Sequence, residues 1–417
     1  MNRQENMNYD APAADINRWR TIALGVGGIF SIIILVVAMF FPEQREQALR
    51  AWLLGFIFWG GIGIGGLGIL ILQHLTGGAW GIVIRRTAEA CSRTLPIIAL
   101  LFVPIAVGVY FHWIYEWTHL IGTDDVILSR RQPYLTEFWW IVRAAMYFAL
   151  LWIMQHFLNK WSLKQDQSND FETALKMAED SSKFSGPTMV FYVLVVSFAA
   201  IDWVMTLDPH WYSTIWGLLF AVGWALSCFC FSVALLAVLA NKAPMNRVLG
   251  SKHFHDIGKL MLALVMVWAY FNFSQFLIIW SGNLPEETRW YLTRMKGAWG
   301  VIGVLLIVFH FAFPFLVLLN RDLKRNAKWL AATAIFILVL RLVDIFYLIG
   351  PSPQIASAGI RGHSADFMTS FSWMYLVAPI GVGGIWLWYF FGKLLERPLV
   401  PINDPYLEGA INHGKGH

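Results

Sequence analysis

The sequence has few charged residues and very little cysteine. Charged side chains make up 14% of its 417 residues and hydrophobic ones 58%, whereas roughly 25% of the residues in a soluble domain are charged. This composition excludes an ordinary water-soluble fold. The three cysteines, Cys91, Cys228 and Cys230, lack the spacing of an iron–sulfur or zinc site. We therefore expect an integral membrane protein whose cysteines are small buried side chains.

Patterns for other cofactors and for nucleic acid are also missing. A haem held by two histidines requires histidines on facing helices, and His310 is the only one near the centre of an apolar run. The six glycines between positions 60 and 68 resemble a dinucleotide loop, but no strand precedes them, so they indicate close helix packing. The net charge of +5 comes from Lys and Arg clusters between apolar runs, which membrane topology explains. We predict no cofactor in this chain, no nucleic-acid partner, and contact with the lipid bilayer.

Ten apolar runs are long enough to cross a hydrocarbon core of about 30 Å. The predicted fold is therefore all-α: a polytopic membrane protein with ten transmembrane helices. The expected spans are 21–41, 52–73, 94–115, 137–158, 187–207, 211–240, 257–281, 297–319, 328–350 and 367–392.

Lys and Arg are distributed unevenly between the two sides of these spans. The two termini and the even-numbered loops hold twenty of them, and the other five loops hold eight. Cytoplasmic segments of membrane proteins are enriched in Lys and Arg. We therefore expect a cytoplasmic N-terminal segment at 1–20 and a cytoplasmic tail at 393–417.

The two halves of the chain share a short pattern. Asp202 and Asp344 each stand seven residues before a proline at the predicted outer end of a span. Spans two to five and six to nine then follow in the same order and orientation, as a parallel repeat requires. We interpret the halves as two four-helix bundles, 52–207 and 211–350, with spans 21–41 and 367–392 as flanking helices.

Ionisable side chains at membrane depth are costly and usually face a bundle interior, so each is a candidate site residue. Arg341 and Asp344 are three residues apart on one helical face, and we expect an ion pair that is either structural or part of proton conduction. Asp202 has no partner one turn away. It is expected either to be protonated or to meet a charge from another helix.

Arg143 and several histidines complete the set of candidates. Arg143 needs an acid or carbonyl partner that the sequence does not reveal, and His310 is either a hydrogen-bonded core residue or a proton relay. Polar side chains at the cytoplasmic side are either simply solvated or an entrance for protons; they are His74, His156, His253, His255, Asp256 and Lys259. The hypothetical proton path therefore comprises Asp202, His310, Arg341, Asp344, His74, His156 and Arg143.

Three segments resemble a known family: LQHLTGGAWGIVIRRTAEA at 72–90, DWVMTLDPHWYSTIWG at 202–217 and RLVDIFYLIGPS at 341–352. They resemble the polysulfide-reductase-type, or NrfD-like, membrane subunits. Within that family the chain is most similar to the second large membrane subunit of alternative complex III, a bacterial quinol:cytochrome c oxidoreductase. The likeness covers nearly the whole chain, and 72–90 is its most specific part. It implies two four-helix bundles plus flanking helices, a place in the inner membrane, and no redox cofactor in this subunit.

The resemblance also implies partner subunits. These are a homologous membrane subunit that holds quinol, and subunits that carry iron–sulfur clusters and several c-type haems. No pattern here matches a quinol site residue by residue, so the sequence leaves open whether this chain binds quinone or takes part in catalysis. We expect a subunit that scaffolds the membrane arm and conducts protons. The alternatives are a purely structural anchor and a secondary transporter, the latter disfavoured because Pro104 and Pro314 interrupt spans that do not correspond under the repeat.

Overall fold

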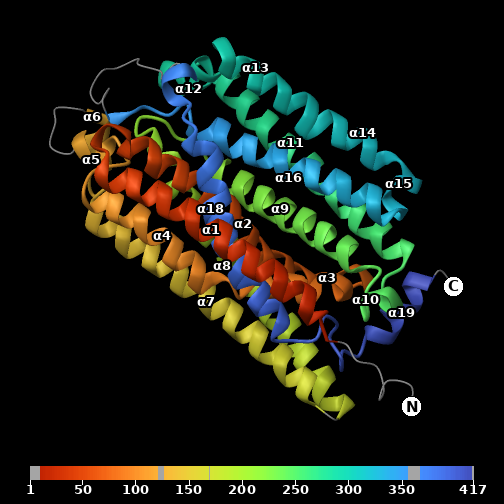
Figure 1. The fold of residues 1–417 in the computed structure, drawn as a ribbon. Helices are drawn as coiled ribbons and strands as arrows, with labels where there is room; N and C mark the ends of the chain where they lie inside the picture. Colours follow the sequence, from red (N-terminus) through yellow and green to blue (C-terminus); the bar gives the residue numbers. More distant parts are fainter. Residues whose placement is uncertain (1–9, 121–125, 169, 356–366, 416–417) are drawn as a thin grey trace.

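The computed structural model describes residues 10–120, 126–168, 170–355 and 367–415, and every element within them is helical. In this part of the chain nine helices are long and apolar enough to cross a membrane, and a bent helix pair supplies a tenth crossing if it counts as one span. The chain is therefore a multi-pass helical membrane protein, which confirms the predicted fold class. The elements are drawn in Figure 1.

The long helices are α1 (Ala13–Phe40), α2 (Arg45–Thr76), α3 (Ala79–Ser92), α4 (Leu95–Tyr110), α7 (Glu137–Gln167), α8 (Phe171–Trp203), α9 (Trp216–Leu239), α11 (Ser251–Gly282), α16 (Ala327–Ile349) and α18 (Met374–Leu395). Another span consists of α13 (Gly297–Leu306), a π-helical segment (Ile307–Ala312) and α14 (Phe313–Leu319). The short helices are α5 (Trp117–Leu120), α6 (Val126–Arg131), α10 (Met245–Val248), α12 (Pro285–Arg294), α15 (Arg321–Arg325), α17 (Phe367–Ser370) and α19 (Leu407–Lys415).

Local sequence signals explain several helix ends. Thr136 precedes α7 and accepts the backbone N–H of Trp139 at 3.4 Å, and Asp170 precedes α8 and accepts that of Thr173 at 3.0 Å. Both are N-cap residues that satisfy a donor the helix leaves free. At the C-terminal end of α11, Asn283 caps the helix with a left-handed φ of 48°, a conformation that asparagine tolerates.

Two expected spans differ from the observed helices. The run at 94–115 contains α4, which has only 16 residues and is too short to span alone. It joins α3 at an angle of 41°, and the two helices together form the bent pair. The run at 367–392 was placed too early, because its first residues form the separate α17 and the long helix begins at Met374. Apolar composition marks a membrane segment but does not reveal breaks in it.

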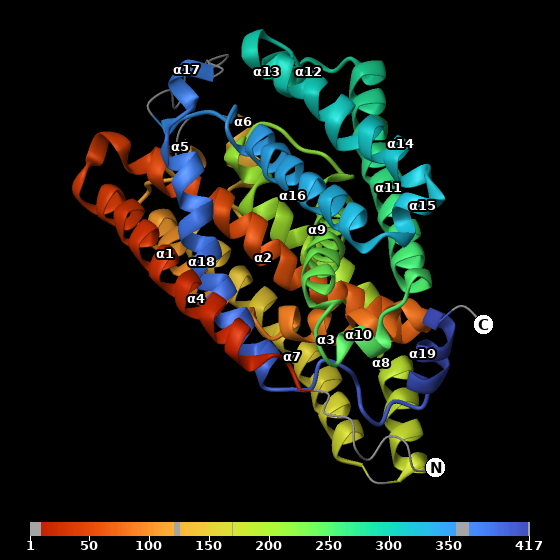
Figure 2. The same cartoon turned by 45° about the vertical axis from the view of Figure 1, so that its right-hand side comes forward.

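The long helices pack as two groups of four around α2 and α9. In the first group α2 contacts α4 and α8, and α7 contacts both of these as well. In the second, α9 contacts α11 and α16, and the α13–α14 span closes the ring against both. The helices α1 and α18 pack on each other, and α18 lies along α2. Figure 2 shows α1 and α18 on one flank and α11, α13 and α14 on the opposite flank.

Helix α2 is the centre of the molecule, and glycines let it approach α9. In its most apolar 18-residue stretch, 94% of the residues are buried. A Cβ at Gly61 would lie 2.2 Å from Trp224 Cδ1, and one at Gly65 would lie 2.2 Å from the Trp224 carbonyl oxygen. Any larger side chain would push the two helices apart. The glycine run therefore serves helix packing, as we expected.

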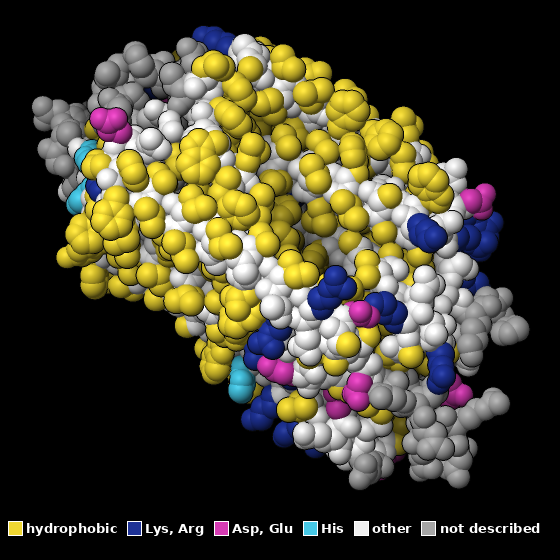
Figure 3. Space-filling view, viewed as in Figure 1, with side chains coloured by type: hydrophobic (Ala, Val, Ile, Leu, Met, Phe, Trp, Pro, Cys, Tyr) yellow, Lys and Arg dark blue, Asp and Glu magenta, His cyan; other side chains and the backbone are white. Residues whose placement is uncertain are grey.

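Charged side chains concentrate at one end of the molecule. We call it the basic end; it holds the start of α1, the α7–α8 junction, α3, α10, α15 and α19 (Figure 1). The helices α5, α6, α12 and α17 lie at the opposite end (Figure 2). Between the ends the visible face is largely hydrophobic, and Lys and Arg gather at the lower right (Figure 3). This distribution is the one that a bilayer across the middle of the molecule requires.

Candidate functional site

The first buried charge pair joins α7 to α8. Arg143 donates from Nε to Oδ2 of Asp202 at 2.8 Å and from Nη2 to Oδ1 at 3.1 Å. One turn along α7, Tyr147 donates its hydroxyl to Oδ2 of the same carboxylate at 2.8 Å. Asp202 is fully buried and the Arg143 side chain is 15% exposed. Asp202 therefore meets a charge from another helix, one of the two states that the sequence left open.

Neighbouring groups satisfy the rest of this pair. Arg143 Nη1 donates to the Tyr134 carbonyl at 2.8 Å, and its guanidinium carbon lies 3.7 Å from the Tyr134 ring centre. Tyr134 stands before α7, outside the spans; partial burial, together with the charge of Asp202, raises the pKa of its hydroxyl to about 12. All three guanidinium nitrogens and both carboxylate oxygens have partners. The cluster is a bidentate ion pair that binds α7 to α8.

The second buried pair lies within α16. Arg341 Nη1 and Asp344 Oδ2 form the expected ion pair one turn apart. Trp268 on α11 donates its Nε1–H to the same carboxylate oxygen at 3.1 Å. Both charged side chains are buried. Gly223 on α9 makes room for the guanidinium, because a Cβ there would lie 2.1 Å from Arg341 Nη2.

Several polar atoms around this second pair have no hydrogen-bond partner among the described residues. They are Nε and Nη2 of Arg341 and both ring nitrogens of His310. The buried His310 ring packs edge-on against Trp268, with ring centres 4.2 Å apart. His310 is therefore a buried core histidine with no hydrogen bond to another described residue, and both of its interpretations then require water. Buried polar groups in proteins normally have hydrogen-bond partners. The unused donors and acceptors of Arg341 and His310 could therefore bind water.

His310 owes its position to a break in its helix. It lies in the π-helical segment Ile307–Ala312, which precedes Pro314. Pro314 has no N–H to donate to the His310 carbonyl, so the regular α-helical hydrogen bonds are interrupted there. Such π-helical turns are often found at functional sites.

The structure separates the histidines of the basic end. His156 is exposed on α7 and its ring stacks on Trp152, with centres 5.0 Å apart. His74 is partly buried at the end of α2, and its Nε2 has no partner within the described part of the chain. His253 is fully buried, accepts the Gly250 N–H at 3.1 Å, and contacts the Ala410 carbonyl through Nε2 at 2.9 Å. His74 thus lies in the interior, His156 on the surface, and His253 in a contact with the C-terminal segment.

The predicted proton-path residues therefore fall into separate groups. Arg143 and Asp202 lie in the first bundle, and His310, Arg341 and Asp344 lie together in the second. The groups could exchange protons only through water or through a change of conformation, since side chains alone do not connect them.

A third buried charge cluster lies around Glu89 on α3, and the sequence analysis did not single it out. Glu89 accepts hydrogen bonds from Arg85 Nε at 3.0 Å, Arg86 Nη1 at 2.6 Å, Ser162 Oγ at 2.7 Å and Arg397 Nη1 at 3.2 Å. The carboxylate is 1% exposed.

The Glu89 cluster ties three parts of the chain together at the basic end. Arg85 also pairs with Asp404 at 2.5 Å, and Arg86 pairs with Asp166 on α7. The Glu89 cluster thus joins α3 to α7 and to the segment after α18. One signal pointed to it: two arginines stand three and four residues before an acid in a largely apolar stretch.

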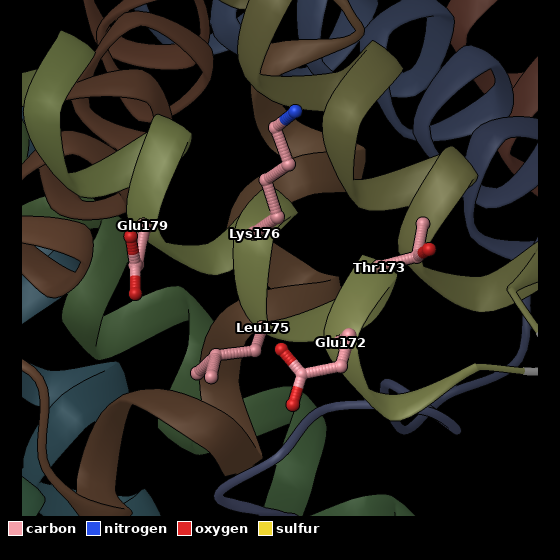
Figure 4. A pocket seen from close by; sticks show the side chains of 5 residues that line it. All are labelled: Glu172, Thr173, Leu175, Lys176 and Glu179. Carbon is pink, nitrogen blue, oxygen red and sulfur yellow. The ribbon is translucent and has the colours of Figure 1, made fainter.

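Two further features of the described residues bear on ligand binding. A surface pocket of about 320 Å³ lies beside the first turns of α8, lined by Glu172, Thr173, Leu175, Lys176 and Glu179 (Figure 4). It is about 35 Å along α8 from Asp202, far from the buried pairs. No group of three or more His, Cys, Asp or Glu side chains able to hold a metal ion occurs among the described residues.

Comparison with known proteins gives no family. No protein-family model matches the chain, and no curated protein is similar to it in sequence. A proposal of function therefore rests on the membrane fold, on the buried charges and on the resemblance of the three segments at 72–90, 202–217 and 341–352.

Proposed function

We propose that this chain is a proton-conducting scaffold subunit of a respiratory quinol:cytochrome c oxidoreductase of the alternative complex III type, in the bacterial inner membrane. One observation carries the proposal: each four-helix group holds a buried arginine–aspartate pair, Arg143–Asp202 in the first and Arg341–Asp344 in the second. The aspartates stand at equivalent places before a proline in the two halves of the sequence. Buried ionisable groups in membrane proteins commonly mark proton or ion pathways.

The second bundle has the better groups for a proton step. His310 has two buried nitrogens without a partner among the described residues, and it lies beside Trp268, which binds Asp344. Histidine exchanges protons near neutral pH when its surroundings allow. A water molecule between the two side chains would connect His310 to Asp344.

Electron transfer in this proposal belongs to partner subunits. A homologous membrane subunit would hold the quinol, and subunits with iron–sulfur clusters and c-type haems would receive its electrons. The present chain would hold these parts in the membrane, with its basic end toward the cytoplasm. The resemblance of residues 72–90, 202–217 and 341–352 to NrfD-like subunits supports this arrangement.

The structure gives one argument against a secondary transporter. Transporters with internal repeats often break corresponding helices of the two halves near mid-membrane. Here the breaks lie in the α3–α4 pair and at Ile307–Ala312. Their counterparts under the repeat, α11 and α7, are continuous helices of 32 and 31 residues.

Two experiments test the proposal. Gentle detergent extraction from native membranes, followed by subunit identification and a haem spectrum, should yield this chain with c-type haem and iron–sulfur subunits. A haem-free particle made of this chain alone would contradict the respiratory assignment.

In the intact complex reconstituted in vesicles, Asp344→Asn and Asp202→Asn should lower the number of protons translocated per electron. An unchanged ratio in both variants, with normal electron transfer, would show that the chain does not conduct protons.

A further inference from the structure

Four cationic side chains meet at the basic end where α15 packs on α11. His255 and Lys259 are one turn apart on α11, and Lys324 and Arg325 are adjacent on α15. The charges of Lys259, Lys324 and Arg325 all disfavour protonation of His255 and lower its pKa, after the larger effect of its burial. Gly258 allows this approach, because a Cβ there would lie 2.8 Å from Lys324 Cγ.

In the described part of the chain a single carboxylate forms an ion pair with one of these four cationic groups. This carboxylate belongs to Asp256. Its Oδ1 lies 3.5 Å from Lys259 Nζ, and its Oδ2 lies 2.7 Å from His413 Nε2. No ion pair of Lys324 or Arg325 is seen in the described part of the chain. Burial, helped by the charge of Lys259, lowers the pKa of Lys324, which is 6% exposed.

Hydrogen-bonding capacity is also left over. Nε of Arg325 and Nδ1 of His255 are buried and have no partner among the described residues. An isolated group of like charges repels itself and destabilises the fold. An anion placed between α11 and α15 would relieve the repulsion and accept these free donors, as phosphate oxygens commonly do from Arg and Lys.

The helices above the cluster present an apolar surface. In the most apolar 18-residue stretch of α11, and in that of the α13–α14 span, only 22% of the residues are buried. The exposed side chains nearest to α15 include Leu316 (65%) and Leu319 (53%). Figure 3 shows Lys and Arg atoms at the right-hand end, where α15 lies in Figure 1, beside the hydrophobic surface of α13 and α14. A ligand that fits has a phosphate at one end and hydrocarbon at the other.

We propose that His255, Lys259, Lys324 and Arg325 bind the phosphate of an anionic phospholipid whose acyl chains lie along α11 and α14. Basic pockets between membrane helices at the cytoplasmic surface are suited to such headgroups. This site is independent of the Arg143–Asp202 and Arg341–Asp344 pairs.

The test uses the full-length protein, purified and stripped of lipid in a neutral detergent. Binding of phosphatidylglycerol is followed by native mass spectrometry and by the midpoint of thermal denaturation. We expect phosphatidylglycerol to bind and raise the midpoint, while phosphatidylcholine does neither. Lys324→Gln with Arg325→Gln should weaken phosphatidylglycerol binding by about thirtyfold, because each Lys or Arg near the headgroup contributes about 1 kcal/mol.

Matched variants keep the test decisive. Lys160→Gln with Lys164→Gln removes two exposed charges from the same end of the molecule, on α7, and should leave binding unchanged. Lys259→Gln changes a side chain that is 58% exposed and should fold normally, with binding weakened several-fold. Equal binding of phosphatidylcholine, an equal stabilisation by inorganic phosphate alone, or undiminished binding in both Lys259→Gln and the Lys324–Arg325 double variant would overturn the proposal.

Discussion

The two buried arginine–aspartate pairs look alike in composition but differ in how they are built. In the first bundle Arg143 and Asp202 come from two helices, and every nitrogen and oxygen of the pair has a partner, with Tyr147 and the Tyr134 carbonyl completing the set. In the second, Arg341 and Asp344 belong to one helix, and two guanidinium nitrogens are unpaired among the described residues.

This difference suggests different uses for the same two residue types. A satisfied pair between helices resists change, because any movement of α7 against α8 breaks several charge-assisted hydrogen bonds. The incompletely satisfied pair within α16 is joined to a neighbouring helix by the Trp268–Asp344 hydrogen bond, and it leaves donors for water or for a proton carrier. We therefore expect the first pair to contribute more to stability and the second to contribute more to proton transfer.

The largest effect should follow removal of the charge that connects two helices. Arg143→Met leaves Asp202 buried without a counter-charge, and we expect a loss of about 3–5 kcal/mol in stability, since breaking a buried pair strands a charge. Denaturation of the purified protein in detergent measures this. As a comparison, Arg341→Met with Asp344→Leu removes a whole pair from one helix and should change stability by less than Arg143→Met does. A larger loss in the double variant would reverse our ranking of the two pairs.

A smaller effect should distinguish a hydrogen bond to a buried carboxylate from a hydrogen bond between neutral groups. Tyr147→Phe removes the hydroxyl that binds Asp202 while keeping the ring, and we expect a loss of about 1.5–3 kcal/mol, as for hydrogen bonds to charged groups. The denaturation midpoint of this variant is compared with that of Tyr291→Phe, whose hydroxyl accepts from the neutral Gln275. If both variants lose the same stability, Tyr147 does not owe its effect to the buried charge.

The smallest effect on stability is expected at His310. His310→Phe replaces a buried ring, whose nitrogens have no partner among the described residues, with an apolar ring of similar shape. Stability should stay within about 1 kcal/mol of the parent or rise slightly, because no hydrogen bond to another described residue is lost and a bound water is merely displaced. Proton translocation by the intact complex should fall in the same variant. A loss of stability well above this size would mean that His310 is held by bonds that support the fold.

Local patterns were sufficient for the overall architecture. The lengths of the apolar runs predicted the membrane class and nearly all the spans, because a helix must be long and apolar to cross a bilayer. The Arg341–Asp344 pair was predictable for a similar reason, since residues three apart share a helical face. The break between α3 and α4 was not, because Arg93 and Thr94 resemble an ordinary end of an apolar run.

Contacts between distant segments were beyond the sequence. Arg143 and Asp202 are 59 positions apart, and Glu89 and Arg397 are 308 apart. A single sequence shows that a buried charge needs a partner but not which helix brings it, because the choice depends on how whole helices are rotated and packed. The cationic group on α11 and α15 arises in the same way.

The sequence by itself thus determined that this protein spans the membrane many times and which ionisable residues lie within it, since both follow from transfer free energies that act residue by residue. Only the tertiary structure decided which of those residues meet. It satisfied the charges of the first bundle and left donors free in the second, because hydrogen bonding and burial are properties of the packed helices together.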